Sequence, residues 1–246
     1  MRALELSMHR IVFAFVLAAS SAPAAAQPVA PSPTAESQPK FETPEACHKA
    51  SLAATRSQDY VALLHCVSEA HANFILGETA HRLRTYQSFV SGAPSEATRA
   101  AEAALRKHGL LQVDTRDLLV MADSRVERGM VVCVIQIGNA IRDPKAFLRD
   151  ATAAKKLIEQ ELRSTGQPIF ADEVAKSKDP TLVNVQIMGD KAQAGLKLPD
   201  SDEPAGPLYF VREKGSWVMA LDESEPDWRR PIPDVTAILE VIKKKP

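Results

Sequence analysis

The chain has little net charge, few aromatic residues and only three cysteines among its 246 residues. Its 30 basic side chains nearly balance 31 acidic ones. This balance argues against a nucleic-acid-binding protein, because such proteins normally carry a strong basic excess. No long apolar run follows the first two dozen residues, so we expect no membrane span in the processed chain.

The familiar catalytic and cofactor-binding motifs are also missing. The sequence contains no Gly-x-Ser-x-Gly elbow, phosphate-binding glycine loop, dinucleotide fingerprint or His-Glu-x-x-His pair. Cys47-His48 and His65-Cys66 form the strongest metal signal. Adjacent helical residues point about 100° apart, however, so these four side chains would not converge on one ion. We therefore expect no metal and no cofactor, and we assign no catalytic residue.

Residues 1–26 have the anatomy of a secretory signal peptide. A histidine and an arginine precede the apolar run Ile11–Ala19, which is too short to span a bilayer, and Ala24–Ala26 supplies a small-residue cleavage site. The proline-rich stretch 27–40 then predicts a disordered spacer. We expect an exported protein, periplasmic or secreted; a buried helix or a membrane anchor is the alternative for the apolar run.

Local cap signals predict a pair of N-terminal helices. Thr43 supplies an N-cap hydroxyl and Pro44 a first-turn proline for a helix that runs to about Arg56. Asp59 caps a second helix, which begins at Tyr60 and continues to about residue 89. Two helices joined so tightly must lie side by side or cross closely.

This helix pair brings Cys47 and Cys66 to the same height, since both lie equally far from the break after Arg56. A disulfide between them would staple the helices and stabilise the fold by roughly 3 kcal/mol. Export permits such a bond, and Cys133 is then left over. Two small buried thiols are the alternative.

Three further segments follow. Ser95 caps a helix over Glu96–Lys107, and Asp143-Pro144 begins another. Met130–Ile137 is β-branched enough to favour a buried strand, although its periodicity leaves a helix open. A short helix is expected in the C-terminal extension 226–246.

Thr181–Leu221 carries the strongest strand pattern. Its first part alternates β-branched and polar residues, as a half-buried strand requires, and Gly189-Asp190 closes a hairpin with a two-residue turn. The predicted pairs on the apolar face are Val183 with Leu196, Val185 with Ala194 and Ile187 with Ala192; on the polar face, Asn184 and Gln186 meet Gly195 and Gln193.

A second hairpin is predicted at Lys214-Gly215, and Pro199–Pro207 is the expected loop between the two hairpins. Its predicted pairs are Leu208 with Leu221, Phe210 with Met219 and Arg212 with Trp217. Together the hairpins predict an α+β fold in which a helical layer packs on an antiparallel sheet of at least four strands.

Parts of the sequence resemble the nuclear transport factor two-like superfamily. They are the Thr-Pro-Glu helix start, the segment Asp59–Leu64 and the hairpins with Gly189–Ala192 and Tyr209–Trp217. More narrowly, they resemble its exported bacterial members. The resemblance implies a single cone-shaped domain, 41–225, whose helices pack into a curved sheet that often holds a pocket. An enlarged, mainly helical insert, Ala70–Asp179, departs from this pattern and would cover the mouth of the cone.

The candidate pocket residues lie in the second hairpin: Tyr209, Phe210, Arg212, Trp217 and Met219. Arg212 is also expected to stack on the Trp217 indole. For Phe210, Trp217 and Met219, packing in the core is the favoured interpretation. We expect a non-catalytic domain that binds a small ligand or a protein partner. The alternatives are an isomerase- or dehydratase-like cone enzyme, with a tyrosine and an acid or histidine in its cavity, and a structural accessory domain.

Overall fold

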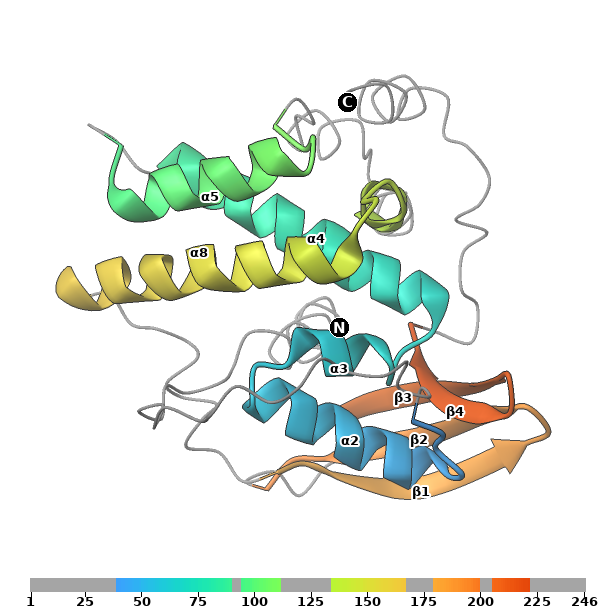
Figure 1. Cartoon of the computed structure of the whole chain (residues 1–246). Coiled ribbons are helices and arrows are strands. Elements are labelled where there is room, and N and C mark those ends of the chain that lie inside the picture. The colour runs from blue at the N-terminus through green and yellow to red at the C-terminus, as the bar shows by residue number, and fades with distance from the viewer. Residues whose placement is uncertain (1–38, 90–93, 112–133, 167–178, 200–204, 222–246) are drawn as a thin grey trace, which may run out of the picture. The chain divides into compact units, whose positions relative to one another are not determined.

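The computed structural model describes residues 39–89, 94–111, 134–166, 179–199 and 205–221 (Figure 1). They form an α+β fold, as predicted, with helices packed against a four-stranded antiparallel sheet. The predicted signal peptide 1–26, almost all of the spacer 27–40, Cys133 and the extension 226–246 lie outside these ranges. Within them, no helix is both long and apolar enough to cross a membrane.

The chain divides into two compact units, of which the first contains residues 39–67, 179–199 and 205–219 among those described. Its elements are α2 (Pro44–Arg56), α3 (Tyr60–Leu64), β1 (Thr181–Met188), β2 (Lys191–Lys197), β3 (Ala205–Glu213) and β4 (Ser216–Ala220). The elements of the second unit are α4 (Glu69–Phe89), α5 (Glu96–Lys107), a short helix at 134–139 and α8 (Pro144–Ser164).

The starts of both N-terminal helices are confirmed. Thr43 Oγ1 accepts a hydrogen bond from the Ala46 N–H at 3.2 Å, and Asp59 Oδ1 accepts one from the Ala62 N–H at 2.9 Å. Between the helices, Gln58 has a φ of 57°, a left-handed conformation that ends α2 and reverses the chain.

The predicted second helix is interrupted, so this part of the prediction is wrong. α3 stops at Leu64 and α4 begins at Glu69. Between them the Cys66 carbonyl accepts a hydrogen bond from the Met219 N–H at 2.9 Å, and Val67 forms a parallel bridge to Met219. A continuous helix would use these main-chain groups internally. Pairing with β4 therefore replaces one turn of helix.

The predicted first hairpin is confirmed near its turn. Gly189 has the expected positive φ, 65°. Ile187 faces Ala192 and Gln186 faces Gln193, as predicted. The strands follow the order β1-β2-β3-β4, so β1 and β4 form the two edges of the sheet.

A β-bulge at Asn184 makes the predicted register wrong for Val183 and Asn184. Asn184 has a φ of 54°, and the ladder shifts at this point. Val183 faces Gly195 rather than Leu196. Leu182 takes the predicted place of Val183 against the core. The inserted residue swaps the two faces of the strand, which a strict period of two does not reveal.

β3 begins earlier than predicted, because Ala205–Pro207 belongs to the strand and not to the loop. Pro207 faces Gly195 of β2. β4 has only 5 residues after the two-residue turn at Lys214-Gly215. Because β4 is so short, it ends before it would lie opposite Pro207. Proline has no N–H to donate, and at this position no hydrogen bond to β4 is lost.

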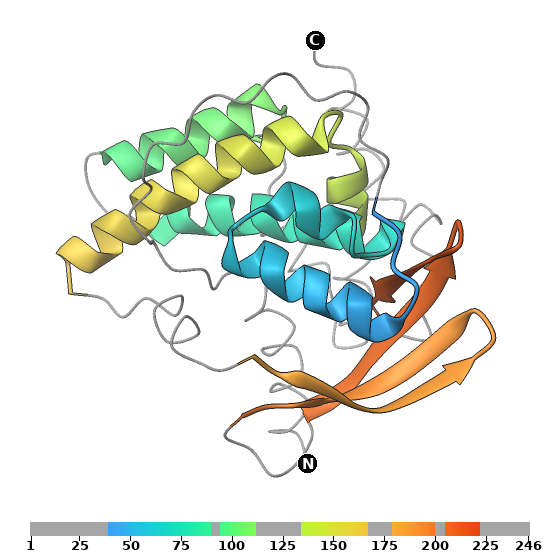
Figure 2. The ribbon, with the colours of Figure 1, turned by 60° about the horizontal axis from the view of Figure 1, so that its bottom comes forward.

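α2 covers one face of the sheet (Figures 1 and 2). The buried residues of this core are Phe41, Cys47, Cys66, Ala192, Ala194, Phe210 and Trp217. The two alanines of β2 are small enough for the helix to approach the sheet closely. The two large aromatic side chains of β3 and β4 then supply much of the buried apolar area, since each buries about 150–250 Å².

The predicted starts of α5 and α8 in the second unit are confirmed. Ser95 Oγ accepts a hydrogen bond from the Thr98 N–H at 3.1 Å, and Asp143 Oδ1 accepts one from the Ala146 N–H at 2.9 Å. Gly166 follows α8 with a φ of 70°, which ends the helix.

The strand favoured for Met130–Ile137 is wrong for the residues that the structure describes, because 134–139 is helical. This short helix contacts α4 directly through backbone atoms. A Cβ atom added to Gly77 would lie 1.9 Å from the Val134 carbonyl oxygen, and one added to Gly138 would lie 1.8 Å from the Asn73 carbonyl oxygen. Glycine is therefore required on both sides of the crossing.

Gly77→Ala should destabilise the protein, although alanine is the better helix former. Helix propensity alone favours alanine by about 1 kcal/mol, but the added methyl group would overlap the Val134 carbonyl. We expect a net loss of about 2 kcal/mol in the free energy of unfolding, measured by urea denaturation. A variant as stable as the wild type would contradict the close crossing.

Lys214→Asn should stabilise the second hairpin. Lys214 and Gly215 have φ values of 51° and 79°, as the two central residues of a type I′ turn require. Asparagine tolerates this conformation better than lysine, and we expect a gain of about 0.5 kcal/mol in the free energy of unfolding. Lys214→Ala, which stays strained at this φ, is the control and should show no gain.

Candidate functional site

The five residues predicted to line a pocket do not share one surface. Phe210 and Trp217 are 1% and 3% exposed and belong to the core under α2. Met219 packs against the same core, and its sulfur accepts a hydrogen bond from the Ser51 hydroxyl at 3.7 Å. Tyr209 precedes Phe210 in β3 and therefore points to the opposite face of the sheet.

The side chain of Arg212 covers the Trp217 ring at the edge of the same core. Its guanidinium carbon lies 5.5 Å from the centroid of the Trp217 ring, which is the predicted stacking contact. The side chain of Arg212 is exposed. Of the predicted set, three residues thus fill the core, Arg212 covers its edge and Tyr209 lies on the other face.

The structure brings Cys47 and Cys66 into one cluster but holds both as free thiols. Cys47 Sγ donates a hydrogen bond to the Cys66 carbonyl oxygen at 3.1 Å. The two residues are 0% and 2% exposed. Burial raises the pKa of each thiol from 9.0 to about 12, and for Cys47 the neighbouring Cys66 adds to this effect.

His48, beside Cys47 in α2, is buried as well. Burial lowers the pKa of its imidazole, and the carboxylate of Asp179 acts in the opposite direction. Asp179 also forms an ion pair with Arg56 at 2.7 Å. Among the residues that the structure describes, no three His, Cys, Asp or Glu side chains are placed to hold a metal ion.

The end of β1 is the most exposed apolar part of the described chain. Ile187 and Met188 are 58% and 52% exposed, and they are the exposed large hydrophobic residues of the described ranges. As neighbours in a strand they point to opposite faces of the sheet. We call this pair the β1 tip.

The two edges of the sheet differ. Along β4, the Trp217 N–H donates to the Phe41 carbonyl at 2.9 Å, and the Met219 N–H donates to Cys66. Beside β1, by contrast, the described chain places no further strand. Peptide groups in an antiparallel strand point alternately to its two sides, so β1 presents hydrogen-bonding groups on its outer side. The β1 tip and this open edge form one continuous surface.

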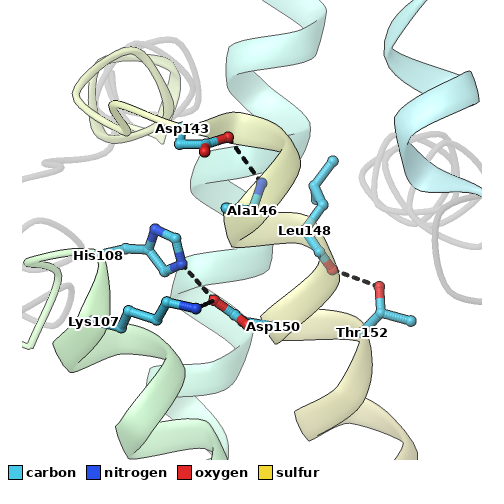
Figure 3. Close-up of polar contacts among 7 residues, drawn as sticks. All are labelled: Lys107, His108, Asp143, Ala146, Leu148, Asp150 and Thr152. Atoms are coloured by element: carbon cyan, nitrogen blue, oxygen red, sulfur yellow. Dashed lines mark hydrogen bonds and ion pairs between the residues drawn. The ribbon is translucent and has the colours of Figure 1, made fainter. Parts of the chain in front are cut away.

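A polar cluster in the second unit joins α5 to α8. Asp150 Oδ2 accepts hydrogen bonds from Lys107 Nζ at 2.9 Å and from His108 Nε2 at 2.8 Å, and Figure 3 shows both side chains directed at this carboxylate. The centroids of the His108 and Phe147 rings lie 5.3 Å apart, and the two rings are nearly perpendicular. These contacts hold the pKa of Asp150 below its usual value, through the Lys107 bond first and the His108 bond next.

A histidine and an aspartate this close are typical of acid–base pairs, but also of contacts that hold helices together. His108 is the C-cap of α5, where the helix dipole favours a donor or a cation, and its ring packs on α8. The cluster is thus explained by its structural role, which is to hold α5 against α8.

Sequence reasoning missed both the β1 tip and the His108–Asp150 contact. The period of two places Ile187 on the apolar face of the sheet, but it does not reveal where the covering helix ends. His108 and Asp150 lie 42 positions apart, and no local pattern connects them. Met188 at the last position before the turn was the one available signal, because strand ends are often exposed.

Comparison of the chain with protein-family models, with curated proteins and with solved structures finds no match.

Asp150→Asn should destabilise the second unit at neutral pH but not in acid. Because the folded pKa of Asp150 is lowered, its contribution is present above the unfolded pKa of about 3.9 and is lost as the pH falls through the folded value. We expect a loss of about 1 kcal/mol at pH 7, since the carboxylate is partly exposed.

Urea denaturation of both proteins between pH 7 and pH 3 measures this difference. Glu102→Gln, which removes an exposed ion pair with Arg106 on α5, is the matched control and should change little. A difference between Asp150→Asn and the wild type that persists unchanged at pH 3 would contradict the assignment.

Proposed function

We propose that this protein is a non-catalytic exported domain that binds an extended segment of a protein partner along β1. The observation that carries this proposal is the β1 tip, where two exposed apolar side chains lie at the end of an open edge strand. A partner strand added to this edge would gain main-chain hydrogen bonds from β1.

The positions of the two side chains suit such a segment. Ile187 and Met188 point to opposite faces of the sheet, and the residues of an added strand alternate between the same two faces. A bound segment would therefore contact both side chains at once. The regular part of β1 after the bulge at Asn184 is short, which favours a brief and reversible contact.

A small-ligand role receives less support. Phe210 and Trp217, which would line a pocket, are instead packed in the core with Phe41 and the two cysteines, and Tyr209 lies on the other face of the sheet. Export remains part of the proposal and is supported by the signal-peptide pattern of residues 1–26. The resemblance to exported nuclear transport factor two-like proteins is compatible with a non-catalytic binding domain.

Photo-crosslinking from Met188 tests the proposal. The full chain, with Met188 replaced by benzoylphenylalanine, is produced and irradiated in the cells that naturally export it. The same probe at Lys49, an exposed position on α2, is the matched control. We expect a discrete adduct with another protein from position 188 and none from position 49.

A second substitution connects the adduct to the edge. Ile187→Asn in the Met188 probe chain should reduce the adduct about tenfold, which corresponds to about 1.4 kcal/mol of lost binding. Ala53→Asn, at an exposed position of α2, should leave it unchanged. Equal adducts from positions 188 and 49, or no effect of Ile187→Asn, would overturn the proposal.

A further inference from the structure

We propose that Cys47 and Cys66 become a disulfide while the chain folds in an oxidising compartment, and that folding then seals the bond inside the core. The proposal requires export only as the source of an oxidant, and it does not depend on partner binding.

The two thiols bond neighbouring backbone groups, and Cys66 Sγ donates to the carbonyl oxygen of Ala62 at 3.6 Å. Cys47 Sγ lies 3.1 Å from the carbonyl oxygen of Cys66. Cys47 comes from the middle of α2, and Cys66 lies in the short connection between α3 and α4. Both side chains belong to one buried cluster. Forming the bond would turn each sulfur from its carbonyl acceptor toward the other cysteine.

The carbonyl oxygen of Cys66 also binds the edge strand β4. Cys66 O accepts the hydrogen bond from the Met219 N–H, and the next residue, Val67, bridges to the same strand. A covalent bond from α2 to Cys66 would therefore fix the segment that covers β4. We expect slower opening of this edge in the oxidised protein than in the reduced one.

Burial determines when the bond can form. The thiolate is the species that attacks a disulfide. Both thiols are almost fully buried, so an oxidant in solution does not reach them in the native protein. Burial also raises the pKa of each thiol to about 12, which makes the thiolate scarce at neutral pH. Oxidation should therefore occur in the unfolded or locally open chain and be very slow in the native protein.

The reaction balances with glutathione disulfide as the oxidant. One cysteine thiolate attacks a glutathione sulfur, forms a mixed disulfide and releases one glutathione thiolate. The second cysteine thiolate attacks the protein sulfur of the mixed disulfide and releases the other glutathione. In total, two protein thiols lose two electrons and two protons, and one glutathione disulfide is reduced to two thiols.

Refolding with and without the oxidant tests this proposal. The full chain, unfolded and fully reduced, is diluted into buffer that contains reduced and oxidised glutathione, free thiols are alkylated, and the protein is digested with trypsin. We expect peptide 41–49 linked to peptide 57–82, while peptide 129–142, which contains Cys133, is alkylated. The reduced native protein, placed in the same buffer, should form the bond at least about a hundredfold more slowly.

Stability and amide exchange provide the second readout. Relative to the reduced form, the oxidised protein should have an unfolding equilibrium constant about a hundredfold smaller, and a slower exchange of the Met219 amide. Cys47→Ser should show the same stability in both buffers. Free Cys47 and Cys66 after oxidative refolding, a bond to Cys133, or oxidation of the native protein as fast as the unfolded chain would each overturn the proposal.

Discussion

The main-chain pairing along β4 is the constraint on which the rest of the first unit depends. Phe41 and Cys66 each bind this strand through a backbone carbonyl, at Trp217 and Met219, although about 175 and about 150 residues separate the two pairs along the chain. The pairing interrupts the helix after Leu64, positions α2 over the sheet and places both cysteines in the core. It also removes β4 as an exposed edge.

The two edges of the sheet consequently have different chemistry. An edge strand with free peptide groups is a template for another strand, and proteins usually cover or distort such edges. In this chain the N-terminal segments cover β4, while β1 carries a bulge at Asn184 and two exposed apolar side chains beyond it. The bulge limits uncontrolled pairing along the whole strand, and the regular end at Ile187-Met188 is the part that the proposed function assigns to a partner.

The fold was predictable where a signal is local. Cap residues such as Thr43, Ser95 and Asp143 placed three helix starts correctly, because capping depends on a few neighbouring atoms. The break between α3 and α4 depends on pairing with Met219, which is far away in the sequence. The one local signal is Ser68, whose hydroxyl oxygen accepts a hydrogen bond from the His71 amide at the start of α4. The helix at 134–139 was missed because its β-branched residues favour a strand when considered alone.

The candidate site was less predictable than the fold. Equal spacing from the helix break correctly brought Cys47 and Cys66 into one cluster, because a tight helix pair leaves little freedom in register. The aromatic residues of the second hairpin have the same sequence pattern whether they line a pocket or fill a core. Only the position of α2 shows that Phe210 and Trp217 are core, and the same position leaves Ile187 beyond the reach of the helix.

Native-state hydrogen exchange at single amides tests most directly the claim that one edge of the sheet is closed and the other open. The amides of Trp217 and Met219 both donate hydrogen bonds to carbonyls of the N-terminal segments. They should exchange slowly, at rates close to that of global unfolding. The Ile187 amide, on the outer side of β1, should exchange at least about a hundredfold faster in the isolated protein. Equal protection of Ile187 and Met219 would show that both edges are covered and would contradict the account.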